Sequence, residues 1–338
     1  MRKYIFTIFL ICLFNMMIAQ GISKTGTTAA QFLKLGIGSK ALGIGGAFTS
    51  IADDPSCLYW NPGGLGNQKK YNIMFDHYNW FLDIKMDYLA LILPLTNYGT
   101  MGFAFNYLHM GEMEVTTTKD PEGTGEKFNA SSYIGQFSYG VKLTDRFSLG
   151  LSVKYIREII WNSHANGVAI DIGTLFRSKI EGLNIGMSVS NYGNKLRMVG
   201  RDLLIQTDID PTLESDPDNV GSSLVTDRFD LPIISRFGIS YKANIISHIS
   251  TTLSIDANHP NDNTQSISIG SEINYNNVAF FRTGFKDLFL KDSQQGISIG
   301  CGLNLKYQNI HYKIDYSYSN YTILGNPQKI TITFVLDS

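Results

Sequence analysis

The stretch Gly296-Ile-Ser-Ile-Gly-Cys-Gly-Leu-Asn-Leu-Lys-Tyr307 decides the fold, because large apolar side chains alternate in it with small or polar ones. A β-strand places successive side chains on opposite faces of its sheet, so this strand has one apolar face and one small, polar face. In a soluble sandwich the apolar face would meet a second sheet. In an outer-membrane barrel it meets lipid, and the polar face lines the lumen.

Fourteen segments with this alternation follow one another from about Tyr71 to Leu336. They are expected at 71–80, 83–94, 98–110, 130–143, 146–161, 163–178, 181–193, 231–244, 247–261, 263–275, 277–288, 294–307, 309–320 and 327–337. Most are longer than the ~9 to 11 residues that cross a bilayer at a tilt, and longer than the ~5 to 6 residues usual in soluble sheets. Segment length therefore favours a membrane barrel.

The lengths of the connections point the same way. Connections after even-numbered segments are brief, whereas both long connections, 111–129 and 194–230, follow odd-numbered segments. Outer-membrane barrels keep short turns on the periplasmic side and longer loops outside. We therefore predict an all-β protein whose residues 69–338 form a transmembrane antiparallel barrel of about 14 strands.

The N-terminal residues have the pattern of an export signal. Arg2 and Lys3 precede a mostly apolar stretch from Tyr4 to Ile18, and Ala19 offers a small-residue cleavage point. The apolar stretch is shorter than the ~20 residues of a spanning helix. We predict a cleaved signal peptide at residues 1–19 and a location in the outer membrane of a Gram-negative cell.

Composition argues against several function classes. Removal of Arg2 and Lys3 takes the net charge from −1 to −3, so the mature chain has no basic excess to attract nucleic acid. No CxxC or HExxH motif occurs, and the six histidines have no recognisable Ser or Asp partner at motif spacing, so no catalytic residue, metal or cofactor is expected and the chain is not predicted to be an enzyme. The mature chain has two cysteines, Cys57 and Cys301, and a single disulfide bridge between them is left as an alternative.

Charged residues on the polar faces of the strands are expected to point into the lumen. Both signs occur, which favours mutual pairing over an ion-selective pore. These residues are Lys154, Asp171, Lys242, Asp256, Glu272, Arg282, Lys306, Lys313 and Asp315.

Residues 20–68 differ from the barrel segments in being rich in glycine. The stretch Gly36-Ile-Gly-Ser-Lys-Ala41 matches the dinucleotide-binding fingerprint, but it lacks the βαβ context that this fingerprint requires, so nucleotide binding is not expected. Glycine permits close backbone contacts. Packing of this segment inside a crowded lumen is the better interpretation.

A family resemblance rests on the same segment. Residues Phe32 to Phe48 (FLKLGIGSKALGIGGAF), then Ala52-Asp-Asp-Pro-Ser56 and Tyr59-Trp-Asn-Pro-Gly-Gly-Leu65, resemble the opening of the PorV/PorQ family. Those proteins are outer-membrane barrels of Bacteroidota and related bacteria, similar in fold to the fatty-acid transporter FadL and associated with type IX secretion. The resemblance implies that residues 20–68 are a hatch inside the barrel. The residues expected to carry the hatch motif are Asp53, Asp54, Asn61, Pro62, Gly63 and Gly64, with Gly63 standing where FadL has alanine.

Two functions compete. In the first, the barrel acts in type IX secretion or surface assembly and contacts secretion-system proteins or cargo through Asp208, Asp210, Glu214, Asp216 and Asp218 of its acidic outer loop. Carboxylates of this loop would also suit calcium, but no EF-hand spacing occurs. In the second, a FadL-like channel admits a hydrophobic small molecule, with Leu203, Leu204, Ile205 and Leu213 as candidate lining. Outer-membrane lipid is the expected partner in both.

Overall fold

The computed structural model describes residues 24–96, 98–208, 220–290, 293–322 and 325–337. The predicted signal peptide, residues 1–19, lies outside them. The short helices are η1 (Gln31–Lys34), α2 (Ser39–Gly43), α3 (Cys57–Trp60), η2 (Pro62–Asn67) and η3 (Arg201–Leu203). The strands are β1 (Tyr71–Asn79), β2 (Lys85–Pro94), β3 (Thr100–His109), β4 (Met113–Glu114), β5 (Lys127–Phe128), β6 (Ala130–Thr144), β7 (Phe147–Ile160), β8 (Ser163–Arg177), β9 (Leu183–Gly193), β10 (Val199–Gly200), β11 (Leu204–Thr207), β12 (Val220–Ser223), β13 (Ile234–Ile246), β14 (Ile249–Pro260), β15 (Ser266–Tyr275), β16 (Ala279–Leu288), β17 (Gln295–Tyr307), β18 (Ile310–Tyr321) and β19 (Gln328–Leu336).

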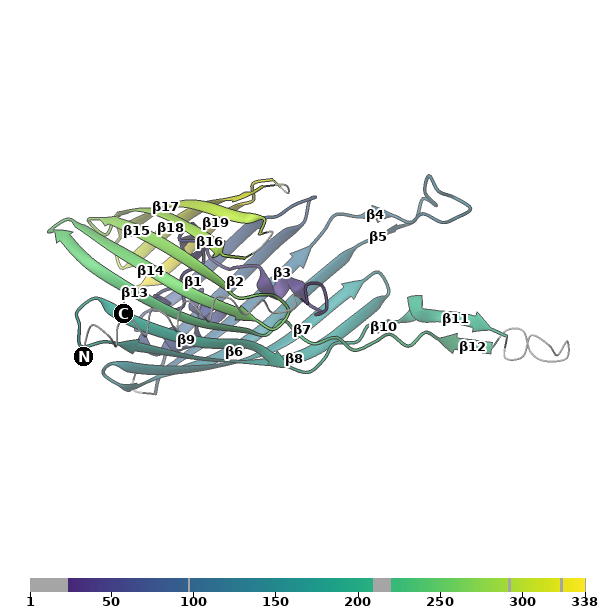
Figure 1. Ribbon diagram of the computed structural model, residues 1–338, viewed down its shortest axis with the longest axis horizontal. Helices are drawn as coiled ribbons and strands as arrows, with labels where there is room; N and C mark the ends of the chain where they lie inside the picture. The colour runs from purple at the N-terminus through teal and green to yellow at the C-terminus, as the bar shows by residue number, and fades with distance from the viewer. Residues whose placement is uncertain (1–23, 97, 209–219, 291–292, 323–324, 338) are drawn as a thin grey trace, which may run out of the picture.

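Fourteen of these strands close into one antiparallel barrel, as predicted. Each pairs with its neighbours in order, and β1 closes the cylinder against β19, with Tyr71 opposite Leu336 and Asn79 opposite Gln328 (Figure 1). The other strands are β10, which extends the pairing of β8, and the hairpins β4–β5 and β11–β12. Closure leaves the barrel wall without a free edge, which is what a sheet needs to span lipid.

The alternation of β17 has the orientation that the sequence predicts. Ile297, Ile299 and Leu303 are 54%, 57% and 49% exposed on the outside, whereas Ser298 is 3% exposed on the inside. Large exposed apolar side chains recur on the outer face of strands around the barrel, and no second layer of described chain covers them. The sandwich alternative is therefore wrong, and the apolar face suits contact with hydrocarbon.

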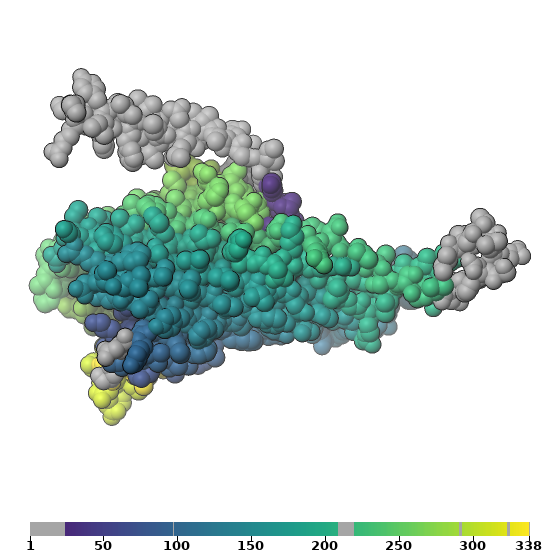
Figure 2. Space-filling view, turned by 90° about the horizontal axis from the view of Figure 1, so that it is seen from below, coloured from purple at the N-terminus to yellow at the C-terminus, as the bar shows by residue number. Residues whose placement is uncertain are grey.

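The two ends of the barrel differ. At one end, here called the turn end, the connections are brief, for example Asp145–Arg146 and Gln308–Asn309. At the other, the hairpin end, the long connections form the hairpins β4–β5 and β11–β12, which project beyond the barrel (Figure 1). Figure 2 shows the second of these as a teal and green extension of the molecular body. The predicted sorting of connection lengths is thus present in the structure.

Several lumen charges predicted from the alternation pair with one another. Lys154 contacts Asp171 at 2.6 Å, and both are buried. Arg282 contacts Glu272 at 2.6 Å and Asp315 at 2.5 Å. The pairs Lys154–Asp171 and Arg282–Glu272 join adjacent strands, and the pair Arg282–Asp315 joins β16 to β18 across β17, in agreement with the expected mutual pairing. Among the described residues, no helix is long and apolar enough to cross a membrane.

Candidate functional site: the N-terminal segment and the barrel wall

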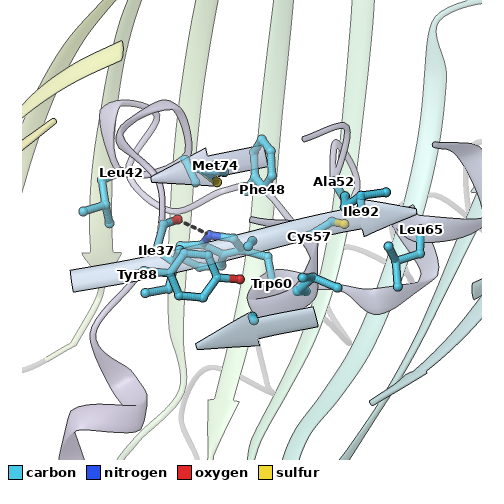
Figure 3. Close-up of a cluster of buried hydrophobic side chains, with 14 of the residues drawn as sticks. Ile37, Leu42, Phe48, Ala52, Cys57, Trp60, Leu65, Met74, Tyr88 and Ile92 are labelled. Carbon is cyan, nitrogen blue, oxygen red and sulfur yellow. Dashed lines mark hydrogen bonds between the residues drawn. The ribbon is translucent and has the colours of Figure 1, made fainter. Parts of the chain in front are cut away.

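The N-terminal segment, defined here as residues 28–68, packs against the inner faces of the barrel strands. Its apolar side chains form a buried cluster with those of β1 and β2, in which Phe48, Trp60 and Leu65 are at most 4% exposed (Figure 3). The indole Nε1 of Trp60 donates to the carbonyl oxygen of Ile37 at 2.8 Å. This bond joins two parts of the segment that are 23 residues apart. The segment is thus folded on itself as well as against the wall.

Inward-facing glycines allow the segment to touch the wall. A Cβ added at Gly150 would lie 2.0 Å from the carbonyl oxygen of Pro62, and one at Gly186 would lie 2.2 Å from that of Thr49. Gly140, Gly150 and Gly173 stand directly opposite one another on β6, β7 and β8. Comparable pairs link β9 with β13 (Gly186 and Gly238) and β15 with β16 (Gly270 and Gly284). This glycine belt explains how backbone from two elements can approach so closely.

Polar side chains of the wall satisfy backbone groups of the segment. Asp256 of β14 accepts from the Thr49 amide at 2.8 Å, and Ser298 of β17 accepts from the Gly45 amide at 3.0 Å. Further bonds run from Gln136 Nε2 to Leu58 O, from Ser148 Oγ to Gly63 O and from Ser188 Oγ to Trp60 O. A segment with little helix and no strand of its own leaves many buried backbone groups that need such partners.

At the seam between the first and last strands, two opposite charges hold the segment. Lys329 of β19 contacts Asp76 of β1 at 2.9 Å, and both side chains are almost fully buried. Lys329 also donates to the carbonyl oxygen of Gly36 at 2.6 Å, while Asp76 accepts from the amide of Gly38 at 3.1 Å. The ion pair therefore binds the segment to both strands at once.

The predicted Asn61-Pro62-Gly63-Gly64 motif lies at the wall formed by β7 and β8. The side-chain amide of Asn61 donates to the carbonyl oxygens of Thr49, at 2.7 Å, and of Thr174 in β8, at 2.9 Å. Its Oδ1 accepts from the amide of Gly63 at 3.0 Å and so caps η2. Asn61 thus uses three hydrogen bonds to join two turns of the segment to one barrel strand.

The other two residues of the predicted motif face within the segment. Asp53 contacts Lys40 at 2.7 Å, and although burial works against its charged form, Lys40 holds the pKa of Asp53 below its usual range. Asp54 accepts from the amide of Ser56 at 2.8 Å, and burial raises the pKa of Asp54. The structure therefore gives both carboxylates local partners. The action of this segment as a movable hatch stays a prediction.

The start of the segment is tied to the hairpin end. Asp262, in the connection between β14 and β15, accepts from Lys34, Gln31 and Thr28. Burial opposes its ionisation, but these hydrogen bonds outweigh burial and hold the pKa of Asp262 below its usual value. The amide of Ala29 also donates to the carbonyl oxygen of Asp230, at 3.0 Å.

A small cavity of about 10 Å³ remains between the segment and the wall. Its walls are mostly apolar, with a few polar groups: Leu33, Ile37, Tyr59, Tyr88, Ala104, Asn106, Ile134, Gln136 and Lys154. That volume suffices for about one water. No local sequence pattern indicates this cavity, because its lining comes from four strands and three parts of the segment that only closure of the barrel brings together.

The residues proposed earlier as ligand lining and partner surface lie elsewhere. Leu204 and Ile205 are on the projecting strand β11, 62% and 39% exposed, and Leu203 is half-buried in η3. None of them lines the cavity beside the segment. Asp208 is exposed just beyond β11. Asp210, Leu213, Glu214, Asp216 and Asp218 lie outside the described residues.

Metal-ligating side chains do not gather into a metal centre in the described part of the chain. No group of three or more His, Cys, Asp or Glu could hold a metal there. Cys57 is buried in the segment and Cys301 is exposed on the outer face of β17, so both are free and the bridge left open by the sequence does not form.

Comparison with known proteins identifies one matching family model. The model of an uncharacterised protein family, UPF0164, matches residues 16–196, which is more than half of the chain. Among curated proteins, none matches the sequence.

Solved structures show the same fold. The toluene transporter TodX of Pseudomonas putida is similar with a TM-score of 0.58 and 12% identity, over 90% of this chain and 98% of that one. The toluene transporter TbuX of Ralstonia pickettii gives 0.55 and 11%, over 89% and 97%. A FadL homologue of Pseudomonas aeruginosa gives 0.52 and 12%, over 88% and 98%. The chain is therefore an outer-membrane-type β-barrel of FadL-like fold, and two of these neighbours are named as toluene transporters.

Proposed function

Because the chain belongs to the family UPF0164, which prescribes no activity, we propose its function from the geometry: the barrel holds a protein partner at the cell surface through its projecting hairpins, in secretion or surface assembly. The PorV/PorQ resemblance of residues 32–65 supports this proposal and suggests type IX secretion as the setting. The signal-like N-terminus and the long connections at one end support an outer-membrane location with the hairpin end outside.

The observation that carries the proposal is the apolar character of a hairpin that projects beyond the barrel. Leu204 of β11 is 62% exposed, and Leu224 and Val225, just after β12, are 51% and 77% exposed. These residues lie beyond the apolar outer face of the barrel, so contact with lipid does not explain why apolar side chains are exposed there. Apolar side chains grouped on an exposed element are typical of protein interaction sites.

The filled lumen supports the same conclusion. The glycine belt brings the N-terminal segment into contact with the wall, and the cavity beside it measures only about 10 Å³. A toluene-sized molecule needs a far larger space, since ligand pockets typically measure ~300 Å³ or more. Passage through the lumen would require the segment to move, whereas the projecting hairpins need no rearrangement to meet a partner.

The test replaces exposed apolar side chains of the β11–β12 hairpin and leaves the barrel strands unchanged. We would substitute Leu204→Ser, Leu224→Ser and Val225→Ser together in the full chain, with Gln206→Ala and Ser223→Ala on the same hairpin as the matched control. Proteins on intact cells are then quantified by mass spectrometry of peptides released by brief proteolysis. We expect the triple variant and a gene deletion to lose the same surface proteins, and the control to retain them. An unchanged surface in the deletion strain would refute the proposal.

A second candidate function, the uptake of a hydrophobic small molecule, is favoured by the fold and by the mostly apolar lining of the cavity. Two of the structural neighbours are named as toluene transporters. Uptake of labelled long-chain fatty acid and of toluene by wild-type and deletion cells separates the two functions. Loss of uptake with a normal cell surface would favour the second function over the first.

A further inference from the structure

A groove of about 440 Å³ opens on the outside of the barrel at the hairpin end. It lies where the chain leaves β9 and passes along β8 toward β10. Its lining consists of Asn166, Asn194, Lys195, Arg197, Val199 and Arg228. Three of these six residues are cationic and none is acidic. Neither the fold nor the proposed function accounts for this charge.

The alternation of the chain turns the cations outward. Leu196 is 1% exposed and belongs to an inner apolar cluster, so Lys195 and Arg197 on either side of it point away from the lumen. Asn166 is exposed on β8, and Arg157 of β7 stands directly opposite it in the strand register. A fourth cation therefore lies beside Asn166 on the same face of the sheet.

Two of the three cations that line the groove have no ion-pair partner among the described residues. Lys195 contacts Asp230 at 3.2 Å, whereas Arg197 and Arg228 form no ion pair with a described residue. The Nε atoms of Arg197 and Arg157 are buried and have no hydrogen-bond partner in the described part of the chain. Buried donors are normally paired, so these two guanidinium groups at the groove keep hydrogen-bonding capacity that no described residue uses.

The groove adjoins the apolar outer face. Val168 and Ile170 follow Asn166 on the outer face of β8 and are 48% and 44% exposed, and Tyr192 of β9 is 68% exposed. An amphiphile could place its charged group in the groove and its acyl chains along these side chains. An inorganic anion would contact only the cationic groove and would leave the apolar side chains beside it unused.

We propose that this groove binds the phosphate-bearing headgroup of an anionic lipid in the outer leaflet. Arginine suits the task because its planar guanidinium gives paired hydrogen bonds to phosphate oxygens. Basic pockets at the membrane interface of other proteins bind lipid headgroups in this way. The proposal does not depend on the function proposed for the hairpins.

The experiment measures binding to the purified full-length barrel in a zwitterionic detergent. The probes are short-chain phosphatidylglycerol, phosphatidylcholine with the same chains, and inorganic phosphate. The variant is Arg197→Gln with Arg228→Gln. Its matched control is Arg146→Gln with Lys179→Gln, which removes two exposed cations from turns at the other end. Heat-modifiable migration on gels confirms that each variant is a folded barrel.

We expect phosphatidylglycerol to bind the wild type and the control with equal affinity, and the groove variant about thirtyfold more weakly. Phosphatidylcholine should bind far more weakly than phosphatidylglycerol. Unchanged phosphatidylglycerol binding in the groove variant would overturn the proposal. So would equal affinity for the two lipids, or inorganic phosphate binding as tightly as phosphatidylglycerol, since a free-anion site would then suffice.

Discussion

Gly150→Ala tests whether the contact between the N-terminal segment and the wall depends on the glycine belt. The new Cβ would lie 2.0 Å from the carbonyl oxygen and 2.2 Å from the carbonyl carbon of Pro62, where ordinary contacts begin at 3.4 Å. The segment must therefore retreat by about 1.4 Å. The strand itself accepts alanine, because Gly150 is not among the residues with positive φ.

A retreat of that size weakens the hydrogen bonds on both sides of Pro62. Ser148 Oγ donates to Gly63 O at 2.7 Å, and Asn61 Nδ2 donates to Thr174 O at 2.9 Å. Loss of two such bonds costs about 2 kcal/mol, within the range of 1–3 kcal/mol for overpacked sites. We expect the segment to open about thirty times more often.

Hydrogen exchange followed by mass spectrometry measures this opening in peptides that cover residues 58–66. Exchange there should accelerate, while exchange in β1 and β19 stays as in the wild type. The control is Gly135→Ala on β6, where an added Cβ meets no atom within 4 Å. Wild-type exchange in the Gly150→Ala protein would show that the close contact does not hold the segment.

Three further predictions concern the hairpin end, the outer face and the lumen. Because the pKa of Asp262 is lowered, its ionised form stabilises the attachment of residues 28–34 at neutral pH, and this contribution should decline below about pH 4 and be lost as the pH falls through the lowered pKa. Asp262→Asn should remove that pH dependence from the exchange of residues 28–34. A fluorophore on Cys301, which is exposed on the outer face of β17, should be quenched by brominated acyl chains, whereas buried Cys57 should resist labelling in the folded barrel. An unquenched Cys301 label would contradict lipid contact at that face. Lys154→Met leaves the buried carboxylate of Asp171 without its 2.6 Å partner and should destabilise the barrel by about 3 kcal/mol or more in urea unfolding from detergent, whereas Lys154→Met with Asp171→Leu should recover much of the loss.

The barrel was predictable because every strand repeats one short-range rule. The alternation in β17 alone identifies its outer and inner faces, and the observed strands begin and end within a few residues of the expected positions for most segments. The hairpins β4–β5 and β11–β12 were missed as strands, since they are short and extend a connection rather than a buried face. Composition indicated only that those connections were long and polar.

The contacts of the N-terminal segment were not predictable to the same degree. Its glycine content suggested close packing, but the partners of Thr49, Gly45 and Leu58 lie between 78 and 253 residues away in the chain. No local pattern encodes such pairings. The inward glycines of the strands were visible in the sequence as small residues, and only the register of the closed barrel shows that Gly140, Gly150 and Gly173 form one row.

The ion pair between Asp76 and Lys329 has a consequence for biogenesis. These residues come from the first and last strands, and both also bond to backbone between Gly36 and Gly38. The cylinder cannot complete this arrangement until the two strands meet, and the segment cannot acquire both bonds before that moment. Closure of the seam therefore completes the attachment of residues 36–38, so this part of the segment reaches its final position only when the cylinder is sealed.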